Sequence, residues 1–319
     1  MIICILTFDL KFGTKVIIPY FCSKDFYHSC NMLFLYRLIY GFCWLLALLP
    51  LRCLYLISDF IFVLVRYVVR YRYKVVMDNL RHSFPEKTEK ERRKIARQFY
   101  RFLCDLFIET LKVIHLKPKQ LHRRIRYVNP EIFDDLYRKG KQIFIACGHY
   151  GNWEWTSTLE NTIPYHHVTL YQPLENKFSD RFFYDLRTKN GSDAISSYTA
   201  IRAIYQYIKE NRLCVFGFMT DQSPGRDAHY WTTFLNQDTP VYLGVEKLAK
   251  RYNTAVVYYE VQRVKRGYYE VTVTLITENA AETAENEITD KHVRLLEQTI
   301  RRKPQYWLWS HRRWKHKRQ

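Results

Sequence analysis

The sequence predicts an α/β fold in which a mixed sheet is flanked by helices and preceded by an N-terminal membrane-associated helical segment. Two observations predict this class. Short apolar runs alternate with helical segments after residue 141, and the most apolar part of the chain lies near the N-terminus. Strand–helix alternation of this kind builds a sheet with helices packed against it. There is no internal repeat or low-complexity segment, so we expect one globular domain behind a membrane-binding region.

The N-terminal apolar part consists of two runs. Leu38–Leu49 carries no charge, whereas Cys53–Val65 is interrupted by Ser58 and Asp59. Neither run reaches the roughly 18 apolar residues of a spanning helix. A marginal single span, a helix lying in the membrane interface and an ordinary buried helix pair therefore all stay open. The basic, Tyr-rich segment Arg66–Arg81 follows, and its charges suit anionic lipid and predict that the body of the protein is cytoplasmic.

These patterns divide the chain into three expected regions. Residues 1–31 form an extension that has the pattern of neither a signal peptide nor an anchor, so Met32 is an alternative start. Residues 32–76 form the membrane anchor and a juxtamembrane basic helix. Residues 77–319 form the cytoplasmic domain.

The elements of that domain follow in order. Thr88 and Glu91 have the spacing of a capping box, which predicts a helix from there towards Val113. The last two of the strands expected after it are antiparallel, because only Arg263–Tyr268 separates them. The expected strands are Gln142–Cys147, Val168–Tyr171, Leu213–Met219, Ala255–Gln262 and Tyr269–Leu275, and the expected helices among them are Lys177–Lys189 and Ala200–Asn211.

Charge and cysteine content restrict the partners. The chain has 50 Lys+Arg against 31 Asp+Glu, a formal net charge of +19, which calls for an acidic partner. Nucleic acid, an anionic membrane and an acidic protein all fit, but a nucleic-acid partner is not expected because it explains neither the apolar N-terminus nor the motif described next. The eight cysteines have no CxxC spacing, so we expect reduced thiols and neither a metal site nor a disulfide framework.

The segment Gly148–Glu154, GHYGNWE, directly follows the first expected strand, where α/β sheets collect functional residues. On a continuous helix, His149 and Glu154 would lie about 140° apart around the axis and could not meet. If the two glycines let the chain turn sharply and Asn152 caps the next helix, the Glu154 carboxylate can reach the His149 imidazole. The sequence therefore predicts a carboxylate–imidazole pair in this loop.

Such a pair fixes the imidazole tautomer and leaves the second ring nitrogen as a base. The motif contains no serine or cysteine, so the hydroxyl that the base activates would belong to the substrate, as in direct acyl transfer to an alcohol. Amides at the start of the next helix could stabilise the oxyanion. A metal site is not expected, because HExxH spacing and a third ligand are missing. The alternative is a loop histidine and a capping glutamate without a catalytic role.

Together with its surroundings, the motif resembles the H-x4-(D/E) motif of the lipid A biosynthesis acyltransferases, the lauroyl and myristoyl transferases of Gram-negative inner membranes. The resemblance extends from Leu33 to Lys317 and implies a fold like that of glycerophosphate acyltransferases. Four further segments are similar to the family in the same order: Val75–Arg101, Met219–Gly225 (MTDQSPG), Thr239–Val257 and Pro304–Lys315 (PQYWLWSHRRWK).

The resemblance implies transfer of a fatty acyl group from an acyl carrier protein thioester to a hydroxyl of a lipid A precursor at the inner membrane, without a cofactor. It implies His149 and Glu154 as the catalytic pair and Asp221 as the acidic residue of a second loop. Arg312 and Arg313 fit either substrate binding or a solvated basic tail. The candidate substrate-binding residues are Asn152, Arg187, Arg312 and Arg313.

Two other functions stay open. The related glycerophosphate acyltransferases carry a phosphate-binding F-P-E-G-T-R motif after H-x4-D, and no such motif follows Glu154 here. A lysophospholipid or another glycolipid as acceptor is therefore the alternative. A basic nucleic-acid-binding membrane protein is the remote one.

Overall fold

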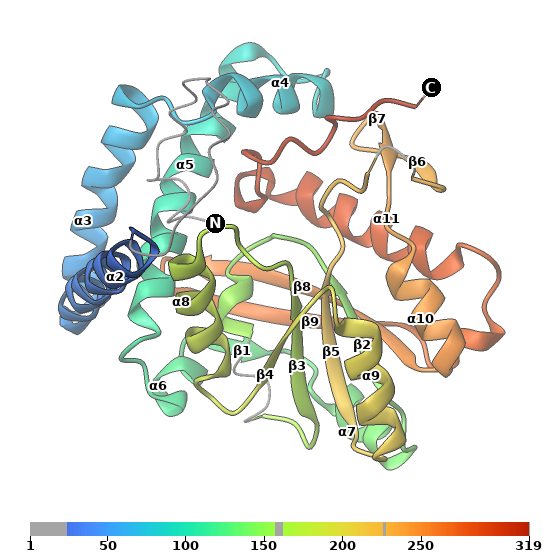
Figure 1. The fold of residues 1–319 in the computed structure, drawn as a ribbon. Coiled ribbons are helices and arrows are strands. Elements are labelled where there is room, and N and C mark those ends of the chain that lie inside the picture. Colours follow the sequence, from blue (N-terminus) through green and yellow to red (C-terminus); the bar gives the residue numbers. More distant parts are fainter. Residues whose placement is uncertain (1–23, 157–161, 226–227, 319) are drawn as a thin grey trace.

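The computed structural model describes residues 24–156, 162–225 and 228–318. Its centre is a seven-stranded mixed sheet in the order β1-β9-β8-β2-β5-β3-β4 (Figure 1). The sheet strands are β1 (Ile125–Tyr127), β2 (Ile143–Cys147), β3 (His166–Tyr171), β4 (Asp193–Ser196), β5 (Cys214–Met219), β8 (Ala255–Lys265) and β9 (Tyr268–Thr277), and β6 (Trp231–Phe234) and β7 (Gln237–Pro240) form a separate hairpin. The predicted mixed α/β sheet is confirmed, and so is the antiparallel pairing of β8 with β9.

Helices cover both faces of the sheet, because successive side chains of a strand point to opposite faces. On β2, Phe144 belongs to one apolar core, and Ile143 and Ile145 belong to the other. Strands buried on both faces are apolar throughout, which explains why the central strands are visible in the sequence. The first core includes α9 (Ala200–Lys209), α10 (Gly244–Tyr252) and α11 (Glu287–Arg302), and the second includes α7 (Glu131–Arg138) and α8 (Lys177–Thr188).

The N-terminal helices pack beside this sheet. The predicted capping box opens α5 (Glu89–Lys112), with the Thr88 amide donating to Glu91 at 2.7 Å. Residues 1–23 of the predicted extension 1–31 lie outside the described residues, and residues 24–31 belong to α2. The division at residues 76 and 77 stays a prediction. The other N-terminal helices are α2 (Lys24–Leu48), α3 (Leu51–Val63), the π-helical turn η1 (Leu64–Val68), α4 (Tyr73–Ser83) and α6 (Pro118–His122).

Helices α2 and α3 and the turn η1 carry large apolar side chains on their outer side. Leu56 is 72% exposed and Phe60 is 64% exposed, which is unusual for residues of this size. In the part of the chain that is described, no helix combines the length and the hydropathy needed to cross a bilayer. We call this face the N-terminal apolar surface, and it consists of Leu38, Ile39, Phe42, Leu45, Leu48, Leu56, Phe60 and Val68.

A buried polar cluster joins these helices to the sheet. Asp105 of α5 accepts a hydrogen bond from the Ser58 hydroxyl of α3 at 2.7 Å and from Arg263 of β8 at 2.7 Å. Arg266, in the turn between β8 and β9, donates to both Asp105 and Asp59. A carboxylate buried with this many charged donors holds its neighbours in fixed positions.

Candidate active site

The site lies where two neighbouring parallel strands end. Strands β2 and β5 pair in parallel, with Cys147 opposite Met219. The chain leaves β2 towards β3 on one side and leaves β5 towards β8 on the other, which makes this edge a topological switch point. His149 follows the end of β2 by two residues, and Asp221 follows the end of β5 by two residues. The equal offsets bring the two side chains together.

Asp221 binds His149 twice. Its Oδ1 lies 2.6 Å from the His149 Nδ1, and its Oδ2 accepts the His149 backbone N–H at 2.7 Å. The indole of Trp307 donates to the same Oδ2 at 2.8 Å. Burial alone would raise the pKa of Asp221, but the charge and hydrogen bonds of His149 and the Trp307 indole outweigh it and lower the pKa to about 2. Asp221 is therefore an anion at neutral pH.

An ionised carboxylate only accepts hydrogen bonds, so the neutral His149 ring carries its proton on Nδ1. The second ring nitrogen, Nε2, is then free to accept a proton. The Gln222 side-chain amide lies 3.4 Å from it, and the Trp153 ring packs edge-on against the imidazole with 5.0 Å between centroids. The arrangement is that of an oriented general base.

The predicted pairing of His149 with Glu154 is wrong. Glu154 lies in a single 3-10 turn over residues 153–156, and it binds the Arg187 guanidinium with two hydrogen bonds of 2.8 and 3.2 Å. The Nδ1 of His149 is bonded to Asp221, and the side-chain amide of Gln222 is the group next to its Nε2. Burial would raise the pKa of Glu154, but the charge of Arg187 lowers it below its usual value. Arg187 thus forms an ion pair with Glu154, and its predicted role in substrate binding stays a prediction.

The two motif glycines turn the chain as predicted, although the turn serves Asp221 rather than Glu154. Gly151 has φ +63°, and a Cβ there would lie 2.0 Å from the Val261 carbonyl oxygen of β8. A Cβ on Gly148 would lie 2.7 Å from Leu296 and 3.1 Å from the Asp221 carboxylate. Only glycine permits this backbone to pass so close to its neighbours.

Asn152 is fully buried and its side chain faces the protein. Its amide donates to Glu109 of α5 at 2.8 Å, and its oxygen accepts from the Trp155 backbone N–H at 3.3 Å. The predicted cap is thus present, on one 3-10 turn, and these bonds position the motif; the predicted role of Asn152 in substrate binding stays a prediction. Glu109 also accepts from the Tyr55 and Tyr269 hydroxyls, and burial raises its pKa.

The C-terminal segment closes the other side of the motif. The Gly151 N–H donates to the Tyr306 carbonyl at 3.1 Å, and Tyr150 forms an isolated β-bridge with Trp307. Trp307 is 1% exposed. Residues more than 150 positions apart in the sequence therefore form one buried unit around His149.

Residues 23–316 match a family described as bacterial lipid A biosynthesis acyltransferase. The chain belongs to this family. The suspected resemblance is confirmed, and membership makes the chain an acyltransferase of lipid A biosynthesis with a lipid A-type acceptor. A comparison with curated proteins found no match.

In this acyltransferase the two C-terminal arginines have different surroundings. Arg312 is exposed, whereas Arg313 is 2% exposed and donates to the Pro240 carbonyl at 2.6 Å. The Arg313 Nε and Nη1 make no hydrogen bond within the described residues. Burial lowers the pKa of Arg313 to about 10, against the opposing effect of nearby Asp221. A solvated tail is therefore the wrong description of Arg313.

Sequence reasoning missed several residues of the site. Gln222, Trp307 and His311 lie inside segments that the resemblance had already marked, so their neighbourhood was the available signal. His311 accepts the Ser223 backbone N–H at 3.3 Å, and burial lowers its pKa to about 4. For Glu109 the sequence offered only a weaker indication, namely that a carboxylate stands among the apolar residues of the predicted helix. Across the described ranges, no three carboxylate, thiol or imidazole groups are placed to share a metal ion.

Proposed function

We propose that the acyltransferase moves a fatty acyl group from an acyl carrier protein thioester to a hydroxyl of a lipid A precursor, with His149 as general base. The observation that carries this proposal is the His149–Asp221 pair, in which a buried anion holds Nδ1 and leaves Nε2 available. The base takes the proton of the acceptor hydroxyl as its oxygen attacks the thioester carbonyl. A C–O bond forms, the C–S bond breaks, and the imidazolium returns the proton to the departing sulfur.

A covalent acyl-enzyme is not part of the proposal. Cys147 is the thiol closest in sequence to the base, and its Sγ donates to the Phe218 carbonyl at 3.3 Å. Burial raises the pKa of Cys147 to about 12, so it is a neutral thiol and a poor nucleophile. The substrate hydroxyl is therefore the nucleophile that His149 serves.

Two features support the substrates. The Nε and Nη1 of the buried Arg313 have no partner among the described residues, and Arg313 lies near Asp221, so it suits a phosphate of the acceptor. A cavity of about 310 Å³ is lined by residues that come after Asp221 in the sequence, and it suits part of a fatty acyl group. The lining residues are Pro224, Gly225, Ala228, His229, Val241, Tyr242, Leu243, Gly244 and Lys247. The net charge of +19 suits the acidic carrier protein.

The same proposal places the protein at the inner membrane with its catalytic domain on the cytoplasmic side. The N-terminal apolar surface supports this, because several exposed apolar side chains of this size on consecutive helices suit a contact with lipid or protein. The basic segment 66–81 follows it directly in the sequence, where cations suit an anionic leaflet.

The test uses the purified full chain, an acyl carrier protein thioester and a lipid A precursor, with the products identified by mass spectrometry. We expect an added acyl ester in the wild type and a loss of about 10²–10⁴-fold in kcat for His149→Ala. A lysophospholipid serves as the competing acceptor. If the lysophospholipid is acylated in preference, the acceptor is wrong; if His149→Ala keeps near-wild-type turnover, the base is wrong.

A further inference from the structure

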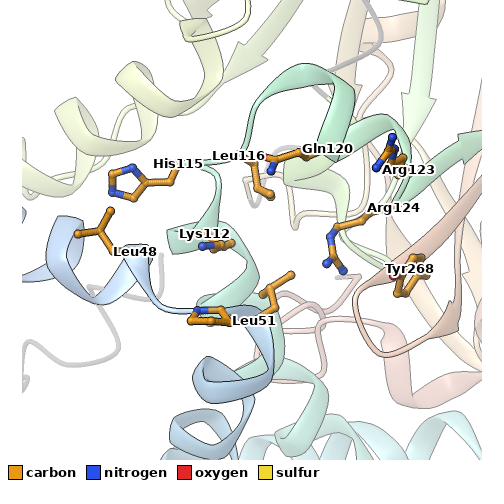
Figure 2. Close-up of a pocket in the computed structure, with 10 residues that line it drawn as sticks. Leu48, Leu51, Lys112, His115, Leu116, Gln120, Arg123, Arg124 and Tyr268 are labelled. Atoms are coloured by element: carbon orange, nitrogen blue, oxygen red, sulfur yellow. The ribbon is translucent and has the colours of Figure 1, made fainter.

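A second cavity, of about 600 Å³, lies apart from His149 (Figure 2). Its walls come from the end of α2, the start of α3, the end of α5, α6 with the residues on either side of it, and the first residue of β9. Lys112, His115, Arg123 and Arg124 line it, and none of its lining residues is acidic. A cavity with several cationic groups and no carboxylate in its wall suits an anion.

The cationic groups are incompletely paired. The Lys112 ammonium donates to the carbonyls of Ala47 and Leu49 at 2.7 and 2.9 Å, which holds it at the end of α2. Arg124 donates to one backbone carbonyl and lies over the Tyr268 ring, and the guanidinium of the exposed Arg123 makes no hydrogen bond or ion pair with any described residue. Burial lowers the pKa of Lys112, and the charge of Arg124 lowers it further. An anion between these groups would relieve that repulsion.

The rim of the cavity is apolar on one side. Leu48 and Leu51 line it, and Leu48, which is 51% exposed, belongs to the N-terminal apolar surface. Figure 2 shows both leucines beside Lys112, with Arg124 and Tyr268 further along the cavity. A free phosphate would use only the cations, whereas a phospholipid would use the cations with its headgroup and the exposed Leu48 with its chains.

We propose that this cavity binds the phosphate group of an anionic phospholipid, whose acyl chains lie along the N-terminal apolar surface. The site is separate from the catalytic one, since the two share no residue. It rests on the proposed membrane association but not on acyl transfer. Lys112 lies three residues after Glu109 on α5, about 4.5 Å along the helix axis. Because Glu109 holds Asn152 of the motif, the lipid would bind against the same helix that positions the catalytic loop.

The test measures sedimentation of the full chain with vesicles of phosphatidylcholine alone or mixed with phosphatidylglycerol. The variant is Arg123→Gln with Arg124→Gln. The matched control, Arg202→Gln with Arg251→Gln, removes the same charge from α9 and α10, on the opposite side of the molecule from α2 and α3 (Figure 1). In each pair one arginine has no described partner and the other stacks on a tyrosine, at 5.0 Å for Arg124 and 5.5 Å for Arg251.

We expect the variant to lower the partition coefficient onto the phosphatidylglycerol vesicles by about ten- to thirty-fold, and the control by less than about threefold. Binding to phosphatidylcholine alone should change little in either pair. Equal losses in both pairs would mean general charge attraction and would overturn the site, and so would no loss in the variant.

A soluble arm distinguishes the source of the phosphate. Inorganic phosphate, at an ionic strength matched with chloride, is added to the wild type and the variant while thermal unfolding is followed. If phosphate raises the wild-type Tm selectively and the vesicle binding of the two pairs is equal, the cavity takes free phosphate and the lipid is wrong. Acyl transfer in detergent is measured separately, and the variant should keep its kcat there, so failure of the lipid site and failure of the proposed reaction give different results.

Discussion

Asp221 accepts three hydrogen bonds, two from His149 and one from Trp307, and all three residues are buried. This number of donors explains how a carboxylate can stay ionised without contact with water. It also means that the carboxylate sets both the position of the imidazole, through the ring, and the path of the loop, through the backbone N–H. Asp221 therefore acts on geometry and on protonation at once.

We predict that Asp221→Asn lowers kcat by about 10²–10⁴-fold, because the amide can neither fix the Nδ1–H tautomer nor stabilise the imidazolium. Steady-state kinetics of the purified variant check this. Asp193→Asn is the matched control, since Asp193 bonds the His166 ring at 2.7 Å on the edge strand β4, and its kcat should equal that of the wild type. Unchanged kcat in Asp221→Asn would remove Asp221 from the mechanism.

Glu154 and Arg187 form a pair whose side chains are only 11% and 19% exposed. Removing one partner of such a pair leaves the other charge buried. We predict that Glu154→Gln lowers the free energy of unfolding by about 3 kcal/mol. The double variant Glu154→Gln with Arg187→Gln should recover more than half of that loss.

Urea denaturation of the two single variants and the double variant gives the coupling energy of the pair. A Glu154→Gln variant of wild-type stability whose kcat is strongly reduced would contradict this reading. It would return Glu154 to the chemistry.

At the scale of elements, the loop Gly148–Glu154 is packed between β8, α5 and the C-terminal segment. Gly151 touches the backbone of Val261 and donates to Tyr306, and Asn152 bonds Glu109. The loop has no freedom to accept a side chain at its turning point, so its sequence is restricted by packing as well as by catalysis.

We predict that Gly151→Ala destabilises the fold by about 3 kcal/mol or more, because a Cβ there meets a backbone oxygen and the φ is left-handed. Gly217→Ala on β5 is the control. Its Cβ would have no neighbour closer than 3.8 Å, so it should change stability by less than about 1 kcal/mol. Thermal unfolding of both variants checks this, and equal Tm values would refute the close approach.

Burial explains which elements could be predicted from the sequence. All five expected strands are present in the structure. They could be predicted because each contains an apolar run long enough to recognise in the sequence. Strands β1, with 3 residues, and β4, with 4 residues, were missed because they are short and partly polar. The site was predicted only in part: His149 follows from the motif, but its partner depends on β5 lying next to β2. Strand order is a tertiary property that local spacing does not contain.

At the scale of the whole molecule, buried neutral histidines couple the fold to pH. His167 and His292 are buried, and desolvation lowers the pKa of each to about 4. The His167 Nδ1 and the His292 Nε2 have no hydrogen-bond partner within the described chain. Between about pH 4 and 6.5 the unfolded chain binds protons at these sites that the folded chain does not. The stability that these two neutral histidines contribute is therefore present above pH 6.5 and is lost as the pH drops towards 4.

We predict that the free energy of unfolding falls by about 2 kcal/mol for each of these histidines between pH 7 and pH 5. Urea denaturation at the two pH values measures the difference. In the His292→Gln variant, the free energy of unfolding should fall by about 2 kcal/mol less between the two pH values than in the wild type. A wild-type protein of equal stability at pH 7 and pH 5 would show that protons reach these rings in the folded state.

The contact of Trp307 with Asp221 also has a consequence during translation. Asp221 and the Gly148–Glu154 loop leave the ribosome well before Trp307 is added to the chain. Until then the carboxylate lacks its indole donor and Tyr150 lacks its bridge partner. A chain that ends before Trp307 keeps both partners of the His149–Asp221 contact but lacks the indole that donates to the carboxylate. The catalytic pair therefore gains its full set of hydrogen bonds only when the C-terminal segment folds back onto it.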